Sequence, residues 1–281
     1  MIPMITTNEN VRMPALIYGT AWKKERTADL VEMAVKSGFR GIDTACQPRH
    51  YHEAGVGEAL KRLGESGIER ESLFIQTKFT PASGQDAATI PYDPASALAE
   101  QVKRSFEVSK HNLGTDYVDS LVLHSPLFPY RNLSQVWEAM EFLYDSKGVR
   151  QLGISNCYDL ELLEKLYADA RIKPAVVQNR FYPDSGYDQD IRTWCTHRGI
   201  VYQSFWSLTA NPHLLFSETV QSLSRAYGRT PAQIFYRFLN HIGIVPLIGS
   251  TSPQHIAEDL DIFGFELTSY EVDQIDSLLR S

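Results

Sequence analysis

Residues 38–45 read Gly38-Phe39-Arg40-Gly41-Ile42-Asp43-Thr44-Ala45, a short apolar run with a carboxylate inside it. The length of this run and the glycines that bound its apolar part are typical of a β-strand buried in a sheet. An aspartate in such a strand needs a partner, because an unpaired buried charge costs several kcal/mol. We therefore expect the rest of the sequence to supply the other strands of a buried sheet and a cation for Asp43.

Similar apolar runs alternate with longer helical patterns along the whole chain. Several of them are apolar on both faces, as strands buried on both sides of a sheet require. Eight strand–helix units imply right-handed crossovers and a parallel sheet that closes into a (β/α)8 TIM barrel. A doubly wound sheet would carry a glycine fingerprint after its first strand, and Tyr18-Gly19-Thr20-Ala21-Trp22 is not one. The predicted strands span residues 15–19, 41–45, 73–79, 118–124, 151–156, 175–181, 201–206 and 244–249.

The ends of several helices are also legible. Thr230-Pro231-Ala232-Gln233 and Thr268-Ser269-Tyr270-Glu271 are typical of capping boxes, and Ser252-Pro253 begins another helix. Gly55-Val56-Gly57 lacks the third glycine of a phosphate-binding loop, so we interpret it as the start of a helix.

Composition and charge narrow the class of protein. The 281 residues are 43% hydrophobic and 22% charged, and no linker divides them, so we expect one domain over residues 1–281. A net charge of −7 without a basic cluster argues against a nucleic-acid partner. No apolar stretch approaches the roughly 18 residues of a membrane helix, and residues 1–10 do not resemble a signal peptide. Three cysteines without CxxC spacing favour a reducing compartment, so we predict a soluble cytoplasmic protein without a membrane partner.

Polar side chains end three consecutive predicted strands. Asp43, Lys78 and His124 lie at the ends of the second, third and fourth strands. Active sites of barrels lie at the carboxyl ends of the strands, so we expect these three side chains to meet there. Lys78 is the cation that Asp43 needs. A long loop over residues 80–94 belongs to the same rim, and loops of that length are usually functional or disordered.

The sequence resembles the aldo-keto reductase family over nearly its whole length. The resemblance rests on residues 38–45, 53–60, 77–78, 116–126 and 153–156. It implies a single (β/α)8 barrel with an N-terminal hairpin and an extra C-terminal helix. It also implies an NAD(P)H-dependent oxidoreductase that reduces the carbonyl of a small aldehyde or ketone to an alcohol.

The same resemblance implies a catalytic set of Asp, Tyr, Lys and His. Asp43, Lys78 and His124 match it directly, but the tyrosine is displaced. The family usually places it five residues after the aspartate, where this chain has Pro48. We assign the role to Tyr51, because a longer loop can return the phenol to the same point.

Two alternatives involve the histidines of this loop. In the first, Tyr51 only packs, and His50 or His52 reaches the carbonyl. In the second, His50, His52 and Glu53 hold a metal ion. Three ligands so close in sequence rarely complete a site, so we predict no metal.

Each residue type suits carbonyl reduction. Negative charge grows on the carbonyl oxygen during hydride transfer, so this oxygen needs a proton donor and oriented dipoles. Tyr51 would be the general acid, and Lys78 beside it would lower the pKa of the phenol from its usual value of about 10. Asp43 would keep the ammonium charged, and His124 would orient the carbonyl oxygen.

The resemblance places the nicotinamide cofactor against further strand ends. Ser155, Asn156 and Gln178 would pair with the carboxamide. Phe205 would stack on the nicotinamide ring, with Trp206 as the alternative. The other predicted cofactor-binding residues are Gly19, Thr20, Ala21 and Asp43 at the first two strand ends, and Ser250, Thr251, His255, Glu258 and Asp259 at the adenosine end.

The adenosine end departs from the family pattern. The family often has lysine, arginine and asparagine where this chain has Gly249, His255 and Asp259. Such cations commonly bind the 2′-phosphate of the cofactor. Ser250, Thr251 and the amino end of the next helix would still bind an anion. We therefore predict NADP(H) as the cofactor, with NAD(H) as the alternative.

Two other functions fit parts of the sequence. A cofactor-binding regulatory subunit of the same fold with little turnover would explain the displaced tyrosine. A barrel isomerase or aldolase would use Lys78 as a Schiff base, although Asp43 beside it favours a charged ammonium. The sequence stops at Ser281, where many family members continue into a loop over the pocket, so we expect an open pocket with broad substrate tolerance. The expected partner is a small carbonyl substrate, and the expected assembly is a monomer or weak dimer.

Overall fold

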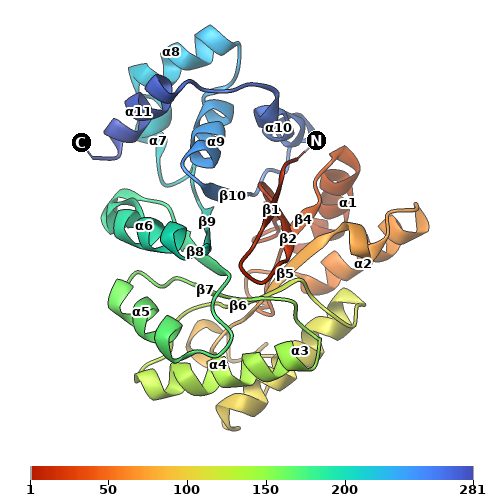
Figure 1. Ribbon diagram of the computed structural model, residues 1–281. Coiled ribbons are helices and arrows are strands. Elements are labelled where there is room, and N and C mark those ends of the chain that lie inside the picture. Colours follow the sequence, from red (N-terminus) through yellow and green to blue (C-terminus); the bar gives the residue numbers. More distant parts are fainter. Residues whose placement is uncertain (1, 281) are drawn as a thin grey trace.

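Eight parallel strands form a closed barrel at the centre of the computed structural model, which describes residues 2–280 (Figure 1). The strands are β3 (Ile17–Gly19), β4 (Gly41–Asp43), β5 (Phe74–Phe79), β6 (Ser120–Leu123), β7 (Leu152–Ser155), β8 (Val176–Arg180), β9 (Val201–Phe205) and β10 (Ile244–Ile248). They pair in chain order, and β10 pairs with both β9 and β3 to close the ring. Each predicted strand contains one of these eight, which confirms the barrel and excludes the doubly wound sheet.

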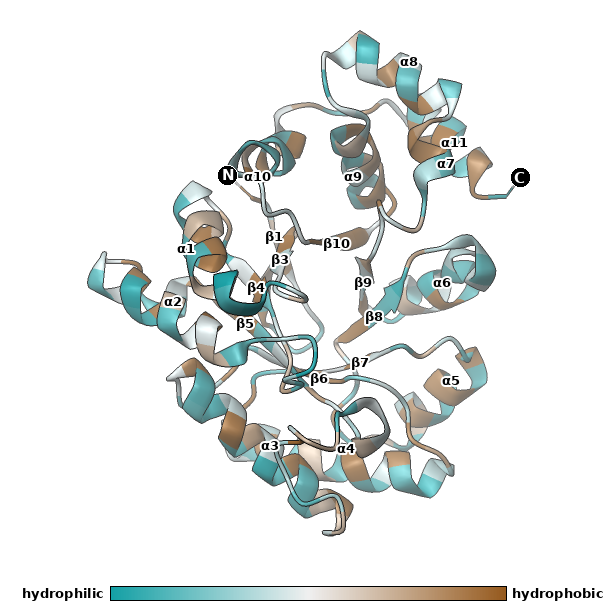
Figure 2. Cartoon of the chain, turned by 180° about the vertical axis from the view of Figure 1, so that it is seen from behind, coloured by the Kyte–Doolittle hydropathy of each residue, from teal (hydrophilic) through white to brown (hydrophobic). Residues whose placement is uncertain are grey.

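Helices surround the barrel and connect its strands (Figure 1). In Figure 2 the strands β8 and β10 are coloured as hydrophobic, whereas the helices around them carry both hydrophobic and hydrophilic residues. This pattern is expected when strands are buried on both faces and helices are buried on one. The helices are α1 (Thr27–Ser37), α2 (Glu53–Glu65), α3 (Leu98–Leu113), α4 (Tyr130–Asp145), α5 (Leu160–Asp169), α6 (Gln189–His197), α7 (Pro212–Leu215), α8 (Glu218–Tyr227), α9 (Pro231–His241), α10 (Pro253–Leu260) and α11 (Ser269–Leu278).

An antiparallel hairpin closes the amino-terminal end of the barrel. It consists of β1 (Met4–Thr6) and β2 (Arg12–Pro14), in a register that pairs Ile5 with Met13. Met13 is fully buried, and it belongs to a small apolar cluster at the beginnings of the barrel strands. The other members of this cluster are Val11, Ile17, Phe74, Val176, Val201 and Val245. The expected N-terminal hairpin is therefore present, and it covers the amino-terminal end of the barrel, opposite the carboxyl ends of the strands.

The predicted helix starts are confirmed. Thr230 and Thr268 form reciprocal capping boxes with the third residue of α9 and α11, and the Ser252 hydroxyl accepts the His255 amide of α10. The Gly57 segment lies in α2, as predicted. A Cβ atom at Gly57 would stand 1.9 Å from the Asn112 carbonyl oxygen, so glycine is required where α2 packs on α3.

Two expectations from composition can be compared with the structure. None of the helices in residues 2–280 is long and apolar enough to cross a membrane. Cys46, Cys157 and Cys195 are buried and unpaired, so no disulfide links the barrel elements described here.

A buried carboxylate ties together the amino-terminal ends of β5 and β6. One Asp119 oxygen accepts hydrogen bonds from the Arg70 guanidinium and the Ile75 amide, both at 2.9 Å, and the other accepts Arg150 at 2.9 Å. Both guanidinium groups also lie over the Tyr117 ring, at 4.2 and 4.3 Å from its centroid. Asp119 therefore neutralises two cations and satisfies a buried amide at a position remote from the open end of the barrel.

We predict that Asp119→Ala lowers the free energy of unfolding by about 2 kcal/mol or more, because two guanidinium groups and a buried amide lose their acceptor. Urea denaturation measures this change. Asp29→Ala is the matched control, because the Asp29 side chain is 73% exposed and pairs with Arg62 at the surface, where a pair contributes less than about 1 kcal/mol. Equal effects of the two substitutions would contradict the role of Asp119.

Candidate active site

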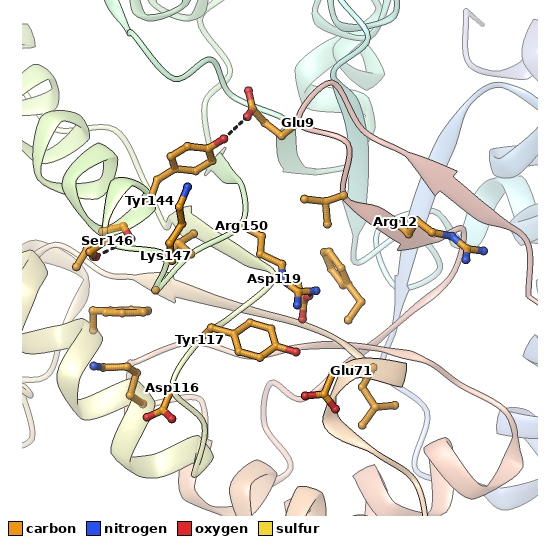
Figure 3. A pocket seen from close by; sticks show the side chains of 18 of the residues that line it. Glu9, Arg12, Glu71, Asp116, Tyr117, Asp119, Tyr144, Ser146, Lys147 and Arg150 are labelled. Carbon is orange, nitrogen blue, oxygen red and sulfur yellow. Dashed lines mark hydrogen bonds and ion pairs between the residues drawn. The ribbon is translucent and has the colours of Figure 1, made fainter.

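Two cavities lie at opposite ends of the barrel. The first, about 1270 Å³, lies beside the hairpin, and three pairs of its polar side chains bond to each other, including Tyr144 and Glu9 at 2.8 Å (Figure 3). The second, about 890 Å³, lies at the carboxyl ends of the strands and is lined by Asp43, Tyr51 and His124. Its volume is that of a small-molecule or cofactor site. We take the second cavity as the candidate active site.

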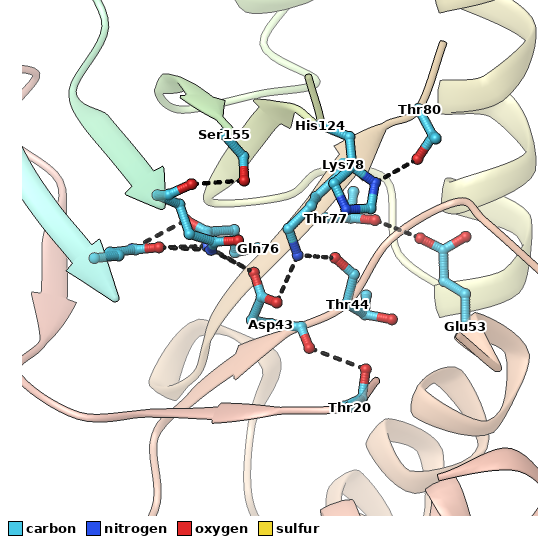
Figure 4. A network of polar contacts seen from close by, with 12 residues as sticks. Thr20, Asp43, Thr44, Glu53, Gln76, Thr77, Lys78, Thr80, His124 and Ser155 are labelled. Atoms are coloured by element: carbon cyan, nitrogen blue, oxygen red, sulfur yellow. Dashed lines mark hydrogen bonds and ion pairs between the residues drawn. The ribbon is translucent and has the colours of Figure 1, made fainter. Parts of the chain in front are cut away.

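Lys78 and Asp43 form a buried ion pair in the wall beneath this cavity (Figure 4). The Lys78 Nζ atom donates to Asp43 Oδ2 at 2.5 Å and to the Thr44 carbonyl at 2.9 Å, and the two charged side chains are 1% and 3% exposed. Burial lowers the pKa of Lys78, and the Asp43 carboxylate offsets only part of this shift. A lysine held in this way is a poor Schiff-base nucleophile, which argues against the isomerase or aldolase alternative.

Two buried glutamines hold the other oxygen of Asp43, and a third links them to each other. Gln76 and Gln178 donate to Asp43 Oδ1 at 2.8 and 3.1 Å, and both also donate to Gln203 Oε1. Gln203 in turn contacts the Met13 sulfur of the hairpin at 3.2 Å. Our sequence analysis missed Gln76 and Gln203, although polar residues inside apolar strands were a usable signal.

The displaced loop returns Tyr51 to the ion pair. Its ring lines the cavity, with the Lys78 Nζ atom 5.1 Å from the ring centroid. The Tyr51 ring also meets the His124 ring edge to face, at a centroid distance of 6.0 Å. A Gln47 carbonyl that accepts the Tyr51 amide at 3.0 Å turns the chain just before α2. The structure therefore brings all four predicted catalytic residues together.

The other polar residues of this loop point in different directions. His50 lines the cavity and stacks on Trp22 at 4.1 Å, whereas the exposed His52 bonds to the Lys24 carbonyl at 3.2 Å. Glu53 turns inward to Thr77 at 2.5 Å. Within residues 2–280, no group of three His, Cys, Asp or Glu side chains is placed to hold a metal ion.

The acidity of Tyr51 differs from our expectation. Burial raises the pKa of Tyr51 above its usual range, and the Asp43 carboxylate raises it further. Lys78 does not offset this rise, because its ammonium bonds to Asp43 and Thr44 and faces the ring instead of the hydroxyl. The expected lowering of the pKa is therefore wrong for this structure, and the phenol stays protonated.

His124 is held as a neutral imidazole. Its Nδ1 atom lies 2.6 Å from the Thr80 hydroxyl (Figure 4). Burial lowers the pKa of His124 to about 3, helped by the positive charges of Lys78 and His50. If Thr80 donates to Nδ1, the ring proton lies on Nε2, where it serves as a hydrogen-bond donor into the cavity. Sequence analysis missed Thr80, which directly follows β5.

Amide and hydroxyl groups gather at the ends of β7 and β8. Ser155, Asn156 and Gln178 all line the cavity, as predicted. Gln178 uses its amide nitrogen toward Asp43 and Gln203, and no residue in the described chain donates to its Oε1 atom. That oxygen is therefore available to an amide N–H of a ligand.

A buried network behind these strand ends fixes the backbone after Asn156. Asn179 bonds to both the amide and the carbonyl of Cys157, at 3.0 and 2.7 Å, and also donates to Asp188 at 2.7 Å. Asp188 accepts a further hydrogen bond from Tyr202 at 2.8 Å. Asn156 itself has φ 53°, a left-handed conformation that asparagine tolerates. Sequence analysis missed this network, because its members face away from the cavity.

The end of the cavity where we predict the adenosine to bind holds an unexpected cation, Lys23. Gly249 lacks the usual lysine side chain, and Lys23 donates to its carbonyl oxygen. The Lys23 Nζ atom lies 3.5 Å from where a Cβ atom of residue 249 would stand. Lys23 therefore brings a positive charge to the place where the chain has lost one. Burial lowers the pKa of Lys23, and the Arg26 charge adds to this effect.

The remaining predicted cofactor residues divide into two groups. Thr20 and Thr251 do not line the cavity. Thr20 is buried and donates a hydrogen bond to the Asp43 carbonyl, whereas Thr251 is exposed to solvent. Burial and the neighbouring Glu258 raise the pKa of Asp259 to about 7. The predicted residues that do line the cavity are Gly19, Ala21, Asp43, Ser155, Asn156, Gln178, Phe205, Trp206, Ser250, His255, Glu258 and Asp259.

The loop over residues 80–94 is packed against the rim. Tyr92 is 7% exposed, stacks on Phe79, and donates to the Thr80 carbonyl at 2.6 Å. Gln47 in the Tyr51 loop donates to the Gly84 carbonyl at 2.7 Å. This loop therefore supplies Thr80 and Gly84 to the cavity wall and supports the loop that carries Tyr51.

Comparisons with known proteins agree with this geometry. The model of the aldo/keto reductase family matches residues 15–280. Glyoxal reductase from Bacillus subtilis is 34% identical over 248 residues, covering 88% of this chain and 82% of that protein. A probable NAD(P)H-dependent D-xylose reductase from Aspergillus fumigatus is 30% identical, with 99% and 95% coverage. The crystal structure of an aldo/keto reductase from Brucella melitensis matches with a TM-score of 0.83 and 29% identity, over 99% of this chain and 100% of that one. The chain belongs to the aldo/keto reductase family.

Proposed function

We propose that this protein reduces the carbonyl group of small aldehydes or ketones to alcohols, with NADPH or NADH as the hydride donor and Tyr51 as the general acid. The observation that carries this proposal is the convergence of Tyr51 with the Lys78–Asp43 pair and His124 on one cavity. Family membership supports the reaction class, since relatives in this family are named as reductases.

Tyr51 and His124 have different roles toward the carbonyl oxygen. The raised pKa keeps the Tyr51 hydroxyl protonated, so it holds the proton that the oxygen needs as negative charge develops. His124 is neutral and donates a hydrogen bond to the same oxygen, which fixes its direction. The Lys78 ammonium, bonded to Asp43 and the Thr44 carbonyl, lies beneath the Tyr51 ring and fixes the wall against which this ring packs.

The residues of the cavity fit a nicotinamide cofactor, which supplies the hydride when bound. The unpartnered Gln178 oxygen, with Ser155 and Asn156, suits the carboxamide, and Phe205 offers an aromatic face beside them. At the other end, Lys23, Ser250 and His255 lie where α10 begins, and a helix amino terminus favours phosphate. These groups would hold NADP(H). Glu258 and Asp259 are acidic and would repel a 2′-phosphate, so NAD(H) is kept as the second choice.

The setting we propose is the cytoplasm, on the basis of the three unpaired, buried cysteines. A regulatory subunit with little turnover is the second candidate, based on the loop that displaces the tyrosine. The return of Tyr51 to the ion pair favours the enzyme.

We predict that Tyr51→Phe lowers kcat at least about 100-fold, the scale for loss of a positioned acid, while cofactor affinity is unchanged. NADPH absorbance with benzaldehyde measures kcat, and fluorescence titration measures cofactor binding. Tyr270→Phe is the matched control, because Tyr270 is 69% exposed on α11. If wild type binds NADPH but reduces no carbonyl in a broad panel, the regulatory function replaces the enzymatic one. If Tyr51→Phe keeps full activity and His50→Gln loses it, His50 is the acid.

The pKa shifts predict a flat pH profile. His124 has a pKa of about 3, below the usual 6.5, so it stays neutral from pH 5.5 upward, and Tyr51 stays protonated because its pKa is raised. We therefore expect kcat/KM for a neutral aldehyde to show no step between pH 5.5 and pH 8.5 that arises from either residue. A rise in kcat/KM as the pH falls through 6.5, absent in His124→Gln, would show that His124 works as a cation.

Lys23 provides a test of the phosphate site. We expect Lys23→Met to raise the Kd of NADPH about tenfold, a change equal to one charged hydrogen bond, and to affect NADH less. Fluorescence titration with each cofactor measures both constants. Lys61→Met on α2 is the control, because Lys61 is exposed and lies outside the cavity. An unchanged Kd for NADPH would remove Lys23 from the phosphate site.

A further inference from the structure

Arg180 is a cation in the wall of the active-site cavity that the mechanism above does not use. It is the last residue of β8, two positions after Gln178. Residues two apart on a strand share a face and lie about 6–7 Å apart along it. Gln178 contacts Asp43 at the floor of the cavity, and Arg180 lines the same cavity closer to the rim.

Aromatic rings, and no carboxylate, hold the guanidinium of Arg180. Its Cζ atom lies 4.2 Å from the Trp206 ring centroid and 5.3 Å from that of Tyr182. Its backbone amide donates to the Tyr158 hydroxyl at 3.1 Å, which fixes the main chain at this point. In residues 2–280, no Asp or Glu side chain lies within ion-pair distance of Arg180. Stacking on an aromatic face leaves the N–H donors at the edge of the guanidinium plane available.

The other lysine and arginine cations at this cavity have partners. Lys78 is bound to Asp43, and Lys23 donates to the Gly249 carbonyl beside the proposed phosphate site. Elsewhere in the described residues, some arginines have acidic partners, as Arg62 does with three carboxylates, whereas others, such as the exposed Arg131, form no ion pair. A chain with a net charge of −7 thus leaves this one cavity-lining guanidinium without an acid.

We propose that Arg180 binds a carboxylate of the substrate, so that the preferred substrates are aldehydes and ketones that carry a carboxylate away from the carbonyl. A guanidinium forms two parallel hydrogen bonds with a carboxylate, and these strengthen in a partly desolvated cavity. The stacked rings pre-organise the group, which reduces the entropy lost on binding. The inference rests on the proposed carbonyl reduction and adds the class of substrate to it.

The position of Arg180 favours the substrate over the phosphates of the cofactor. The groups suited to phosphate, Lys23, Ser250 and His255, lie at the ends of β3 and β10. Arg180 ends β8, which is separated from β10 by β9. It follows Gln178, the residue whose free oxygen suits the carboxamide, so it lies at the end of the cavity where reduction takes place.

Two substrates that have nearly the same shape but differ in charge test whether Arg180 recognises a carboxylate. We expect Arg180→Gln to lower kcat/KM for 4-formylbenzoate about tenfold or more, mainly through KM, and to change kcat/KM for methyl 4-formylbenzoate less than about threefold. Arg180→Lys should retain part of the preference, since it keeps the charge without the paired geometry. Arg131→Gln on α4 is the matched control, because Arg131 is exposed and outside the cavity. Equal losses for the acid and the ester would overturn the proposal, as would no loss for either.

Binding provides a second readout that does not depend on turnover. Benzoate should quench the tryptophan fluorescence of the wild-type protein through Trp206 more strongly than benzamide does, and Arg180→Gln should remove this difference. If no aldehyde is reduced, the proposed function fails, while benzoate binding still tests Arg180. A benzoate response that is the same in wild type and Arg180→Gln overturns the proposal. A raised Kd for NADPH in Arg180→Gln also overturns it, because the guanidinium then serves the cofactor.

Discussion

The buried pair of Lys78 and Asp43 is the interaction on which the site depends. Two opposite charges at 1% and 3% exposure are stable only when every remaining polar atom is satisfied. The barrel achieves this with a Thr44 carbonyl for the ammonium and two glutamine amides for the second carboxylate oxygen. The glutamines are joined through Gln203, which touches the hairpin that closes the far end. Direct contacts through the three glutamines therefore link Asp43, at the carboxyl ends of the strands, to the hairpin at the opposite end of the barrel.

This pair also sets the state of the groups above it. An ammonium fixed beneath the Tyr51 ring contributes to the positive potential that keeps His124 neutral. The Asp43 carboxylate has the opposite effect on the phenol, whose pKa it raises together with burial. A protonated phenol and a neutral imidazole therefore face one cavity at neutral pH. Both can donate a hydrogen bond into the cavity, which is the arrangement that the proposed carbonyl reduction needs.

Cations around the cavity differ in how they are held, and the difference separates their roles. Lys78 is bonded to Asp43 and to the Thr44 carbonyl, and its charge helps to lower the pKa of His124. Lys23 lies against the Gly249 carbonyl, close to the space that a longer side chain at Gly249 would fill. Arg180 is held by the Trp206 and Tyr182 rings, which position a guanidinium without neutralising it. A charge that stays without a protein partner in a concave site is suited to a ligand that brings the opposite charge.

The sequence by itself determined the architecture and located most of the residues that meet in the candidate active site. Alternating apolar runs and capping residues located the eight strands, and Asp43, Lys78 and His124 marked the rim, because strand ends are readable along the chain. The tertiary structure decided what depends on distance between segments. It returned Tyr51 to the ion pair despite the longer loop, turned His52 and Glu53 away, and placed Lys23 beside Gly249. It also reversed the expected pKa shift of Tyr51, because that shift depends on burial and on which face of the ring Lys78 meets. The periodicity of a sequence predicts local secondary structure. Contacts, burial and pKa shifts depend on packing between residues that are distant along the chain.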